Sequence, residues 1–323
     1  MSERARTWRP GRPVDLPGTL GTLVRGRGDP CHRWEGRTGL WRATQTPAGP
    51  GLLLLRTRAA DGEVDARAWG PGADWLLDGV PELLGGHDDA DGTGWAGFRP
   101  RPEHPLLVDA WRARPGVRTP RSRAVLEALV GAAVEQVVTG KESRRSLRDL
   151  ALRFGSPAPG APAQAGGPVE GLRVPPTPQQ WLRVPSWEWL RAGVEGRRSA
   201  VVLRAAGAAG RLEATLEREP AQVEPLLRTL PGVGRWSAAE VRQRAHGDPD
   251  AFSFDDYHVG KNVSWALTGE VLDEDGCAEV IACYSGHRYR VQRLLELAGV
   301  ARPRRGPRMT LPTHTPSATS GRS

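Results

Sequence analysis

Two short motifs contain backbone and side-chain groups that could do chemistry. The first, Leu230-Pro-Gly-Val-Gly234, lies between two segments with helical periodicity. Gly232 and Gly234 permit a tight turn and a close backbone approach. The helix expected from Arg235 onward would point its free amides into that turn. Such a turn is a seat for a phosphate group and requires no particular side chain.

The second motif is the adjacent pair Asp255-Asp256, about 20 residues after this hairpin. We expect Asp256 to cap a helix over 257–268, where backbone amides would hold its charged carboxylate rigidly. A fixed carboxylate can stabilise positive charge that develops on a sugar, and it can orient a water molecule for attack. Taken alone, the pair could be simple capping residues, and the hairpin an ordinary turn with glycine at a C-cap.

The elements that must position these motifs follow from the periodicity of the chain. Residues 15–104 contain short apolar or alternating runs separated by Gly, Pro and Asp, which predicts a β-rich α+β domain. From 105 to 301 the apolar period is helical, as it is over 122–152. We therefore expect an α+β protein whose second, all-helical domain contains the hairpin at 230–234.

Three segments are predicted to remain unpacked. Residues 1–14 are expected to form a flexible basic arm and contain two prolines. Residues 155–178 are rich in Pro, Ala and Gly, which predicts a mobile loop. Residues 302–323 have no apolar period and are predicted to be a disordered basic tail.

Composition limits the classes of function. The chain has 323 residues, a formal net charge of +8 and 38% hydrophobic residues, enough for a real core. Its 3 cysteines are odd in number and widely spaced, which argues against a disulfide framework or an iron–sulfur site and for a reducing cytoplasm. We see no membrane span or secretion signal. The positive charge favours a polyanion such as nucleic acid, although a GC-rich genome explains the arginine bias.

With its flanks, the hairpin resembles the helix-hairpin-helix motif of the DNA glycosylase superfamily of that name. Pro231-Gly-Val-Gly-Arg-Trp-Ser-Ala238 followed by Asp255-Asp-Tyr257 is similar to the pattern of the 3-methyladenine DNA glycosylase II branch. The resemblance covers about 105–300, including the helix around 134–138 and the segment 174–209. It implies a base-excision repair enzyme that flips a damaged, N-alkylated purine out of duplex DNA and hydrolyses its N-glycosidic bond.

The resemblance also implies roles for individual residues. The catalytic carboxylate is the second of the pair, Asp256. Trp236 stands where bifunctional relatives have a Schiff-base lysine, so we expect a monofunctional enzyme without AP-lyase activity. The base pocket would be formed by Trp236, Glu240, Tyr257 and His287. The DNA contacts would be Gly232, Gly234, Arg235, Ser237, Gln136 and Val137, with Val137 as the wedge that replaces the flipped nucleotide.

Three of these pocket and DNA-contact roles have a structural alternative. The indole of Trp236 suits a cationic base, since cation–π attraction contributes about 0.5–2 kcal/mol, but it could instead pack in the core. Glu240 stands where the branch has an aromatic residue, and it could pair with a base or with Arg244 one helical turn later. Val137 could be a buried helix residue. His287 is a match for a second pocket tryptophan, and the match is partial.

The implied enzyme needs no organic cofactor, no metal and no iron–sulfur cluster, although a monovalent cation could bridge the hairpin carbonyls to a phosphate. We expect a cytoplasmic monomer, associated with the nucleoid if bacterial, whose partner is duplex DNA containing damaged bases and not a membrane. Two alternatives stay open. One is a non-catalytic DNA-binding protein of the same fold with a degenerate pocket. The other is a glycosylase for oxidised or deaminated bases. The sequence does not determine the lesion range or any role in self-protection.

Overall fold

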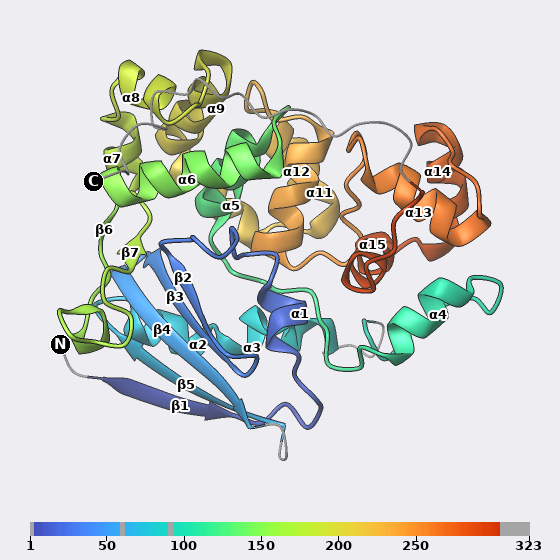
Figure 1. Cartoon of the computed structure of the whole chain (residues 1–323), viewed down its shortest axis with the longest axis horizontal. Helices are drawn as coiled ribbons and strands as arrows, with labels where there is room; N and C mark the ends of the chain where they lie inside the picture. Colours follow the sequence, from blue (N-terminus) through green and yellow to red (C-terminus); the bar gives the residue numbers. More distant parts are fainter. Residues whose placement is uncertain (1–2, 59–61, 90–93, 304–323) are drawn as a thin grey trace.

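The computed structural model describes residues 3–58, 62–89 and 94–303, which form a sheet and a larger body of helices (Figure 1). The sheet has five antiparallel strands in the order β1-β5-β4-β3-β2. They are β1 (Arg4–Trp8), β2 (His32–Glu35), β3 (Gly39–Thr46), β4 (Gly49–Arg58) and β5 (Glu63–Trp69). The expected α+β class is therefore confirmed.

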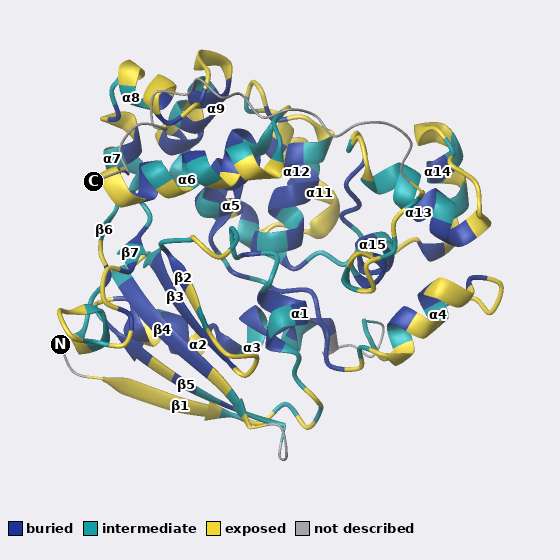
Figure 2. Cartoon of the chain, viewed as in Figure 1, coloured by how far each residue is buried: buried dark blue, intermediate teal, exposed yellow. Residues whose placement is uncertain are grey.

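Both faces of this sheet are covered, because its central strands are apolar at successive positions. Side chains alternate between the two faces of a strand, so Leu53 and Leu55 point one way and Leu52 and Leu54 the other. The first pair packs against α1 (Leu16–Leu20), α2 (Ala73–Asp78) and α3 (Val80–Leu83). In Figure 2, β3 and β4 accordingly appear largely buried.

The opposite face is covered by residues 155–178, so the prediction of a mobile loop there is wrong. This segment contains β6 (Ser156–Pro157), the short turn η2 (Ala161–Ala163) and β7 (Arg173–Val174), and β6 pairs with β7. Its side chains Val169, Leu172 and Val174 are fully buried against the stacked rings of Trp41 and Trp69. Their irregular spacing gives no periodic signal, and their partners Trp41 and Trp69 lie at least 100 residues earlier. Because of this β-hairpin, the second domain is not all-helical.

The N-terminal segment also differs from expectation, because part of the predicted arm at 1–14 is the edge strand β1. Its residues pair with β5 in the register Arg4↔Ala68. Arg4 and Arg6 form ion pairs with carboxylates of α2, so their charge is matched within the fold. The predicted disordered tail at 302–323 lies outside the described residues beyond 303.

The remaining helices, α4 to α15, form two groups, and each group has its own hydrophobic core. The first core joins α5 (Val125–Glu135), α6 (Gly140–Phe154), α7 (Pro178–Leu182), α8 (Ser186–Arg191), α9 (Gly196–Gly207), α10 (Ala209–Glu213), α11 (Pro220–Arg228) and α12 (Arg235–Val241). The second joins α4 (Pro105–Arg112), α13 (Val259–Thr268), α14 (Glu274–Ile281) and α15 (Arg288–Leu297). Across the described ranges, no helix is long and apolar enough to cross a bilayer.

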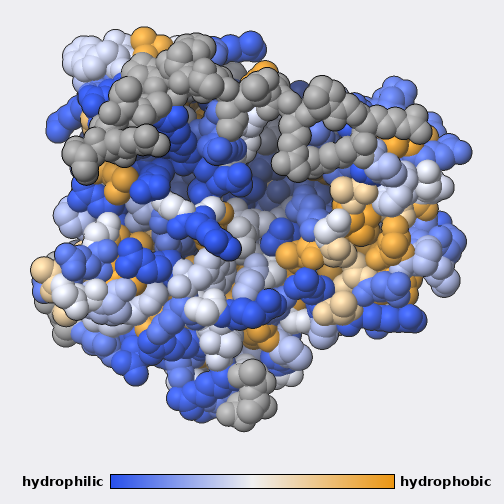
Figure 3. Space-filling view, viewed as in Figure 1, coloured by the Kyte–Doolittle hydropathy of each residue, from blue (hydrophilic) through white to orange (hydrophobic). Residues whose placement is uncertain are grey.

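The site of interest lies where the two groups meet. Helix α12, which follows the hairpin, packs in the first core through Ala238 and Val241. The segment that leads to the aspartate pair packs in the second core through Phe252 and Phe254. On the face shown in Figure 3, hydrophilic side chains cover the region of α6 and α12, and hydrophobic ones gather over the α4, α13 and α15 group.

We predict that Leu172→Ala lowers the free energy of unfolding by about 2–5 kcal/mol, because it leaves a cavity against the sheet. The measurement is urea unfolding followed by circular dichroism. The control is Gln164→Ala, at an exposed position of the same segment. Equal, small effects of the two substitutions would show that the segment does not pack on the sheet.

Candidate active site

The two glycines of the hairpin have different roles. Gly232 has a φ of +93°, and a Cβ there would lie 2.5 Å from Cγ2 of Val201, so the turn itself requires glycine. Gly234 has an ordinary φ of −91°, and a Cβ there would meet nothing within 4 Å. The surface above the start of α12 is therefore open, and no side chain caps this helix. Its first amides are available to an anion.

The hairpin is fastened to the end of α5 by Gln136. Its Nε2 donates to the carbonyl of Gly232 and to Oγ of Ser237, both over 2.9 Å. Ser237 is only 2% exposed. The predicted DNA contact of Ser237 is therefore corrected: its hydroxyl supports the hairpin from inside.

Val137 projects from the short connection between α5 and α6. It is fully exposed, at 103% of the reference area, and has a φ of +55°. A β-branched residue in this left-handed region costs about 1–3 kcal/mol. The connection is fixed by Thr139, which forms a capping box with Glu142 at the start of α6. The alternative of a buried helix residue is wrong, and the helical period over 122–152 is interrupted here.

Asp256 lies directly before α13, and its carboxylate is held by the backbone. Its Oδ1 accepts hydrogen bonds from the amides of His258, over 2.7 Å, and Val259, over 2.9 Å. The helix begins at Val259, two residues later than expected. The side chain is half-buried, which leaves part of the carboxylate open to solvent.

Asp255 is oriented differently from its neighbour. It is exposed and has a φ of +67°, so the chain reverses at this residue. Its carboxyl group faces Glu274 at the start of α14. Burial, together with a hydrogen bond to Asp255, raises the pKa of Glu274.

Arg235 links the first residue of α12 to this turn. Its Nη1 donates to Oε1 of Glu274 over 3.4 Å, and its guanidinium carbon lies 3.8 Å from the ring centroid of Phe254. Arg235 was predicted to contact DNA. In this structure its guanidinium is already stacked and paired within the protein, so a phosphate would compete with Glu274 for it.

Glu240 is buried in a polar network and is not free to meet a base. Its Oε2 accepts from Nη1 of Arg244 over 2.7 Å, and its Oε1 accepts from Oγ of Ser253 over 2.9 Å. Burial alone would lower the pKa of Arg244, but the negative groups around it, Glu240 first and then Glu135, together outweigh burial and raise that pKa. The pairing of Glu240 with Arg244 is thus the alternative that the structure shows, in the interior and not at the surface.

A small cavity of about 200 Å³ opens beside Asp256 and is also lined by Tyr257 and Lys261. Tyr257 is 70% exposed. Nζ of Lys261 lies 4.1 Å from the centroid of the Tyr257 ring. One face of this ring is therefore already covered by a cation.

The other two aromatic residues predicted to form the pocket lie in different surroundings. Trp236, in the first turn of α12, is half-buried and forms no ring stack or cation–π pair with another described residue. His287 packs on Phe98 at 5.2 Å between centroids, and its Nδ1 accepts from Arg290. Burial, and then the charge of Arg290, lower the pKa of His287. Its contacts place it with the second core, and none among the described residues joins it to Trp236.

Sequence reasoning missed Ser253, which connects α12 to the turn at Asp255 and Asp256. Its Oγ donates to Glu240 and accepts from Nε2 of Gln243, over 2.8 Å. The available signal was the alternation Phe252-Ser-Phe254 directly before the aspartates. That alternation marks a buried segment, but it does not identify the partners.

No group of three or more His, Cys, Asp or Glu side chains in the described ranges could hold a metal ion. Among the hairpin carbonyls, that of Pro231 accepts from Arg204 over 2.9 Å, and that of Gly232 accepts from Gln136. Each keeps a second lone pair, so neutral oxygen ligands for a monovalent cation are present. A larger cavity of about 580 Å³ lies between the sheet and α5. It is not part of this site, because neither Asp256 nor Trp236 lines it.

No family model matches the sequence, and no curated protein matches it either. Solved structures share its fold. The 3-methyladenine DNA glycosylase from Archaeoglobus fulgidus has a TM-score of 0.69 at 15% identity and covers 91% of this chain and 98% of its own. MBOgg1, solved with a low-affinity DNA ligand, has a TM-score of 0.69 at 16% identity, covering 93% and 98%. The 8-oxoguanine glycosylase/lyase from Clostridium acetobutylicum has 0.66 at 12%, covering 91% and 97%. The fold of the helix-hairpin-helix DNA glycosylases is thereby confirmed.

The buried Glu240–Arg244 pair predicts a large stability effect. Glu240→Gln keeps the side-chain volume but leaves the buried Arg244 charge without a counter-ion, so we expect a loss of about 3–5 kcal/mol in urea unfolding. Adding Arg244→Met should recover part of that loss. Glu279→Gln, on the exposed side of α14, serves as the control. A loss no larger than that of the control would contradict the buried pair.

Proposed function

We propose that this protein is a monofunctional DNA glycosylase that hydrolyses the N-glycosidic bond of damaged bases in duplex DNA, N-alkylated purines first among them. The observation that carries the proposal is the Asp256 carboxylate. It is held by two backbone amides, it is partly open to solvent, and it follows a hairpin after which α12 begins without a side-chain cap from any described residue. The shared fold with DNA glycosylases supports this class of reaction.

DNA would be held mainly through its backbone. The open amides above Gly234 suit one phosphate, and the positive charge of the chain favours the duplex as a whole. We expect Val137 to enter the base stack when a nucleotide leaves it, because its side chain is fully exposed and its backbone is held in the left-handed region. Flipping a nucleotide out of the duplex costs about a few kcal/mol of stacking energy, and the enzyme must offset this cost with contacts of this kind.

The bond-breaking step follows from the charge that develops. The C1′–N bond breaks with both electrons going to the base, and positive charge builds on the deoxyribose. Asp256 stabilises that charge and orients a water molecule, whose oxygen then bonds to C1′. The water gives up a proton to the carboxylate and from there to solvent. The products are a free base and an abasic site.

An N-alkylated purine suits this site because it carries a positive charge and leaves as a neutral base. It therefore needs no strong general acid. Trp236 is the aromatic face available to it, through cation–π attraction of about 0.5–2 kcal/mol. Tyr257 is a poorer candidate, because Lys261 already covers its ring.

Oxidised purines are the second candidate substrate class, since an 8-oxoguanine glycosylase/lyase shares the fold nearly as closely as the alkyl-purine enzyme does. Release of bases from a panel of duplexes containing alkylated, oxidised or deaminated lesions separates the candidates. Binding to these duplexes without any base release would instead favour a non-catalytic protein of this fold.

We infer that no strand cleavage accompanies base release. Trp236 cannot form a Schiff base, and of the two lysines only Lys261 lines the cavity beside Asp256. Its ammonium is engaged with the Tyr257 ring.

We also propose that the hairpin carbonyls bind a monovalent cation when DNA is bound, and that the enzyme uses no other cofactor. Titrating DNA affinity with K⁺ against an equal concentration of a bulky organic cation tests this.

Asp256→Asn should reduce base release by about 100- to 1,000-fold or more, because it removes the charge that stabilises the sugar cation. DNA affinity measured by fluorescence anisotropy should change little. Asp255→Asn is the matched comparison: asparagine tolerates the left-handed backbone there, so we expect a much smaller loss. Undiminished turnover by Asp256→Asn would refute the assignment.

Val137→Gly should separate stability from activity. Glycine relieves the left-handed strain, so thermal unfolding should show no loss of stability and a gain of up to about 1 kcal/mol. Base release should nevertheless fall about tenfold or more, because nothing then fills the gap in the stack. A variant as active as the parent would rule out Val137 as the wedge.

A further inference from the structure

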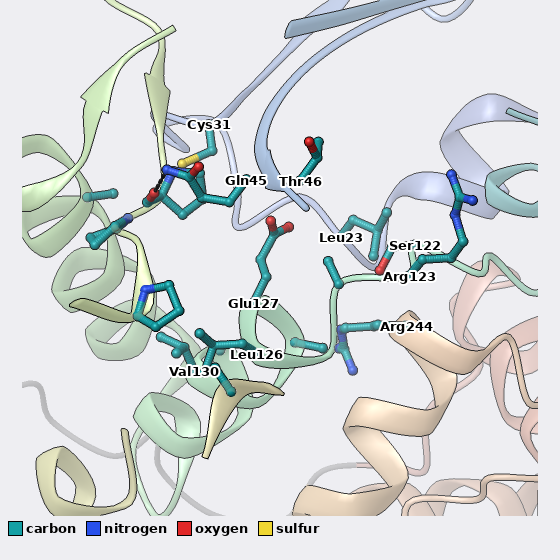
Figure 4. Close-up of a pocket in the computed structure, with 18 of the residues that line it drawn as sticks. Leu23, Cys31, Gln45, Thr46, Ser122, Arg123, Leu126, Glu127, Val130 and Arg244 are labelled. Atoms are coloured by element: carbon teal, nitrogen blue, oxygen red, sulfur yellow. Dashed lines mark hydrogen bonds between the residues drawn. The ribbon is translucent and has the colours of Figure 1, made fainter. Parts of the chain in front are cut away.

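The cavity of about 580 Å³ between the sheet and the helices is large enough for a small organic ligand. Figure 4 shows it between the β3–β4 region, which contributes Gln45 and Thr46, and α5, which contributes Leu126, Glu127 and Val130. The cavity is partly open to solvent, so a ligand can enter it from outside. It is separate from the site around Asp256, so its use does not depend on the proposed function.

The wall of this cavity is mainly apolar. It includes Leu23, Leu126, Val130, Leu147 and Trp181, together with several prolines. A nucleotide or sugar would leave many polar groups without partners against such a wall, and burying an unpaired polar group costs on the order of 1–3 kcal/mol. The wall therefore suits a ligand with a rigid apolar body.

Hydrogen-bond acceptors are concentrated inside. The carboxylate of Glu127 is held from behind by Nη2 of Arg42, over 3.2 Å, and by the hydroxyl of Thr44. Gln45 donates through Nε2 to the carbonyl of Pro175 over 3.0 Å, which fixes its amide and leaves Oε1 as an acceptor. A ligand that places an N–H donor between these two groups would satisfy them.

Unpaired positive charge lies at the α6 side. Arg144 and Arg148 line the cavity, are exposed, and form no ion pair with any residue the structure describes. The other three arginines of the wall are engaged: Arg25 pairs with Glu135, Arg123 with Glu82, and Arg244 with Glu240. Glu217, which also lines the cavity, is exposed. Charge complementarity therefore orients a negative group toward Arg144 and Arg148.

We propose that this cavity is a binding site for an aromatic anion that carries an N–H donor, with its apolar body against α5 and its negative group at Arg144 and Arg148. The walls come from both the sheet and the helices. Bound ligand therefore holds the two together and stabilises the folded protein by mass action.

The test uses 8-anilinonaphthalene-1-sulfonate, which has an apolar aromatic body, an N–H and a sulfonate, with the purified full-length chain. We expect saturable one-to-one binding by fluorescence and calorimetry, and a rise in Tm. The matched probe is N-phenyl-1-naphthylamine, which has the same skeleton without the sulfonate. We expect it to bind at least tenfold more weakly.

Two variants locate the binding. Arg144→Glu combined with Arg148→Glu should weaken the anionic probe at least tenfold and leave the neutral probe unchanged. Val130→Trp should fill the cavity and abolish both. Trp187→Ser, at an exposed apolar position on α8, is the control for adventitious surface binding and should change neither.

The proposal fails if the folded protein binds neither probe, or if the charge reversals leave the binding of the anionic probe unaltered. It also fails if Trp187→Ser removes the binding. Should Val130→Trp not unfold cooperatively, the charge-reversed variant decides, because both of its positions are exposed. Base release plays no part in these readouts, so their outcome is independent of the catalytic proposal.

Discussion

The geometry of the site depends on the hydrogen bonds of the Ser253 hydroxyl. It donates to Glu240 of α12 and accepts from Gln243 and from Gln292 of α15, so it joins the two helical cores at one point. Its backbone amide is satisfied as well, by Oε1 of Gln292 over 3.0 Å. Satisfied buried networks of this kind rigidify what they connect. Asp256 lies only three residues after Ser253, so the same network restricts where Asp256 can lie.

This constraint explains why a carboxylate stands in α12 where the resembling branch has an aromatic residue. Glu240 faces inward, toward Arg244 and Ser253, and it contributes to the attachment of the turn and not to the recognition of a base. An isolated charge could not be buried there without a large penalty. Glu240 and Arg244 are therefore acceptable only as a pair, and the pair is tied to the sheet domain by Nε of Arg244, which donates to the carbonyl of Thr22.

The sheet domain contributes to the site indirectly. It is locked to the helices by arginines that donate to backbone carbonyls, such as Arg293 to Gly18 over 2.8 Å. The segment at 155–178 closes its outer face. Between the sheet and the helices lies a cavity lined by Glu127, which is paired with Arg42, and by the exposed Arg144 and Arg148. The same chain thus contains two separate candidate sites, the hairpin with Asp256 and this partly open cavity between the sheet and the helices.

The sequence by itself determined the features whose causes are local. The glycine hairpin, the capping role of Asp256 and the change from strand to helix periodicity depend on φ preferences and hydrogen bonds between residues a few positions apart. Tertiary structure decided the rest, because the partners are distant in the chain. Leu172 is buried because it packs against Trp41. The left-handed backbone of Val137 depends on where α5 ends and α6 begins. Where the conformation of a side chain depends on neighbours so remote in the chain, the periodicity of the sequence does not reveal it.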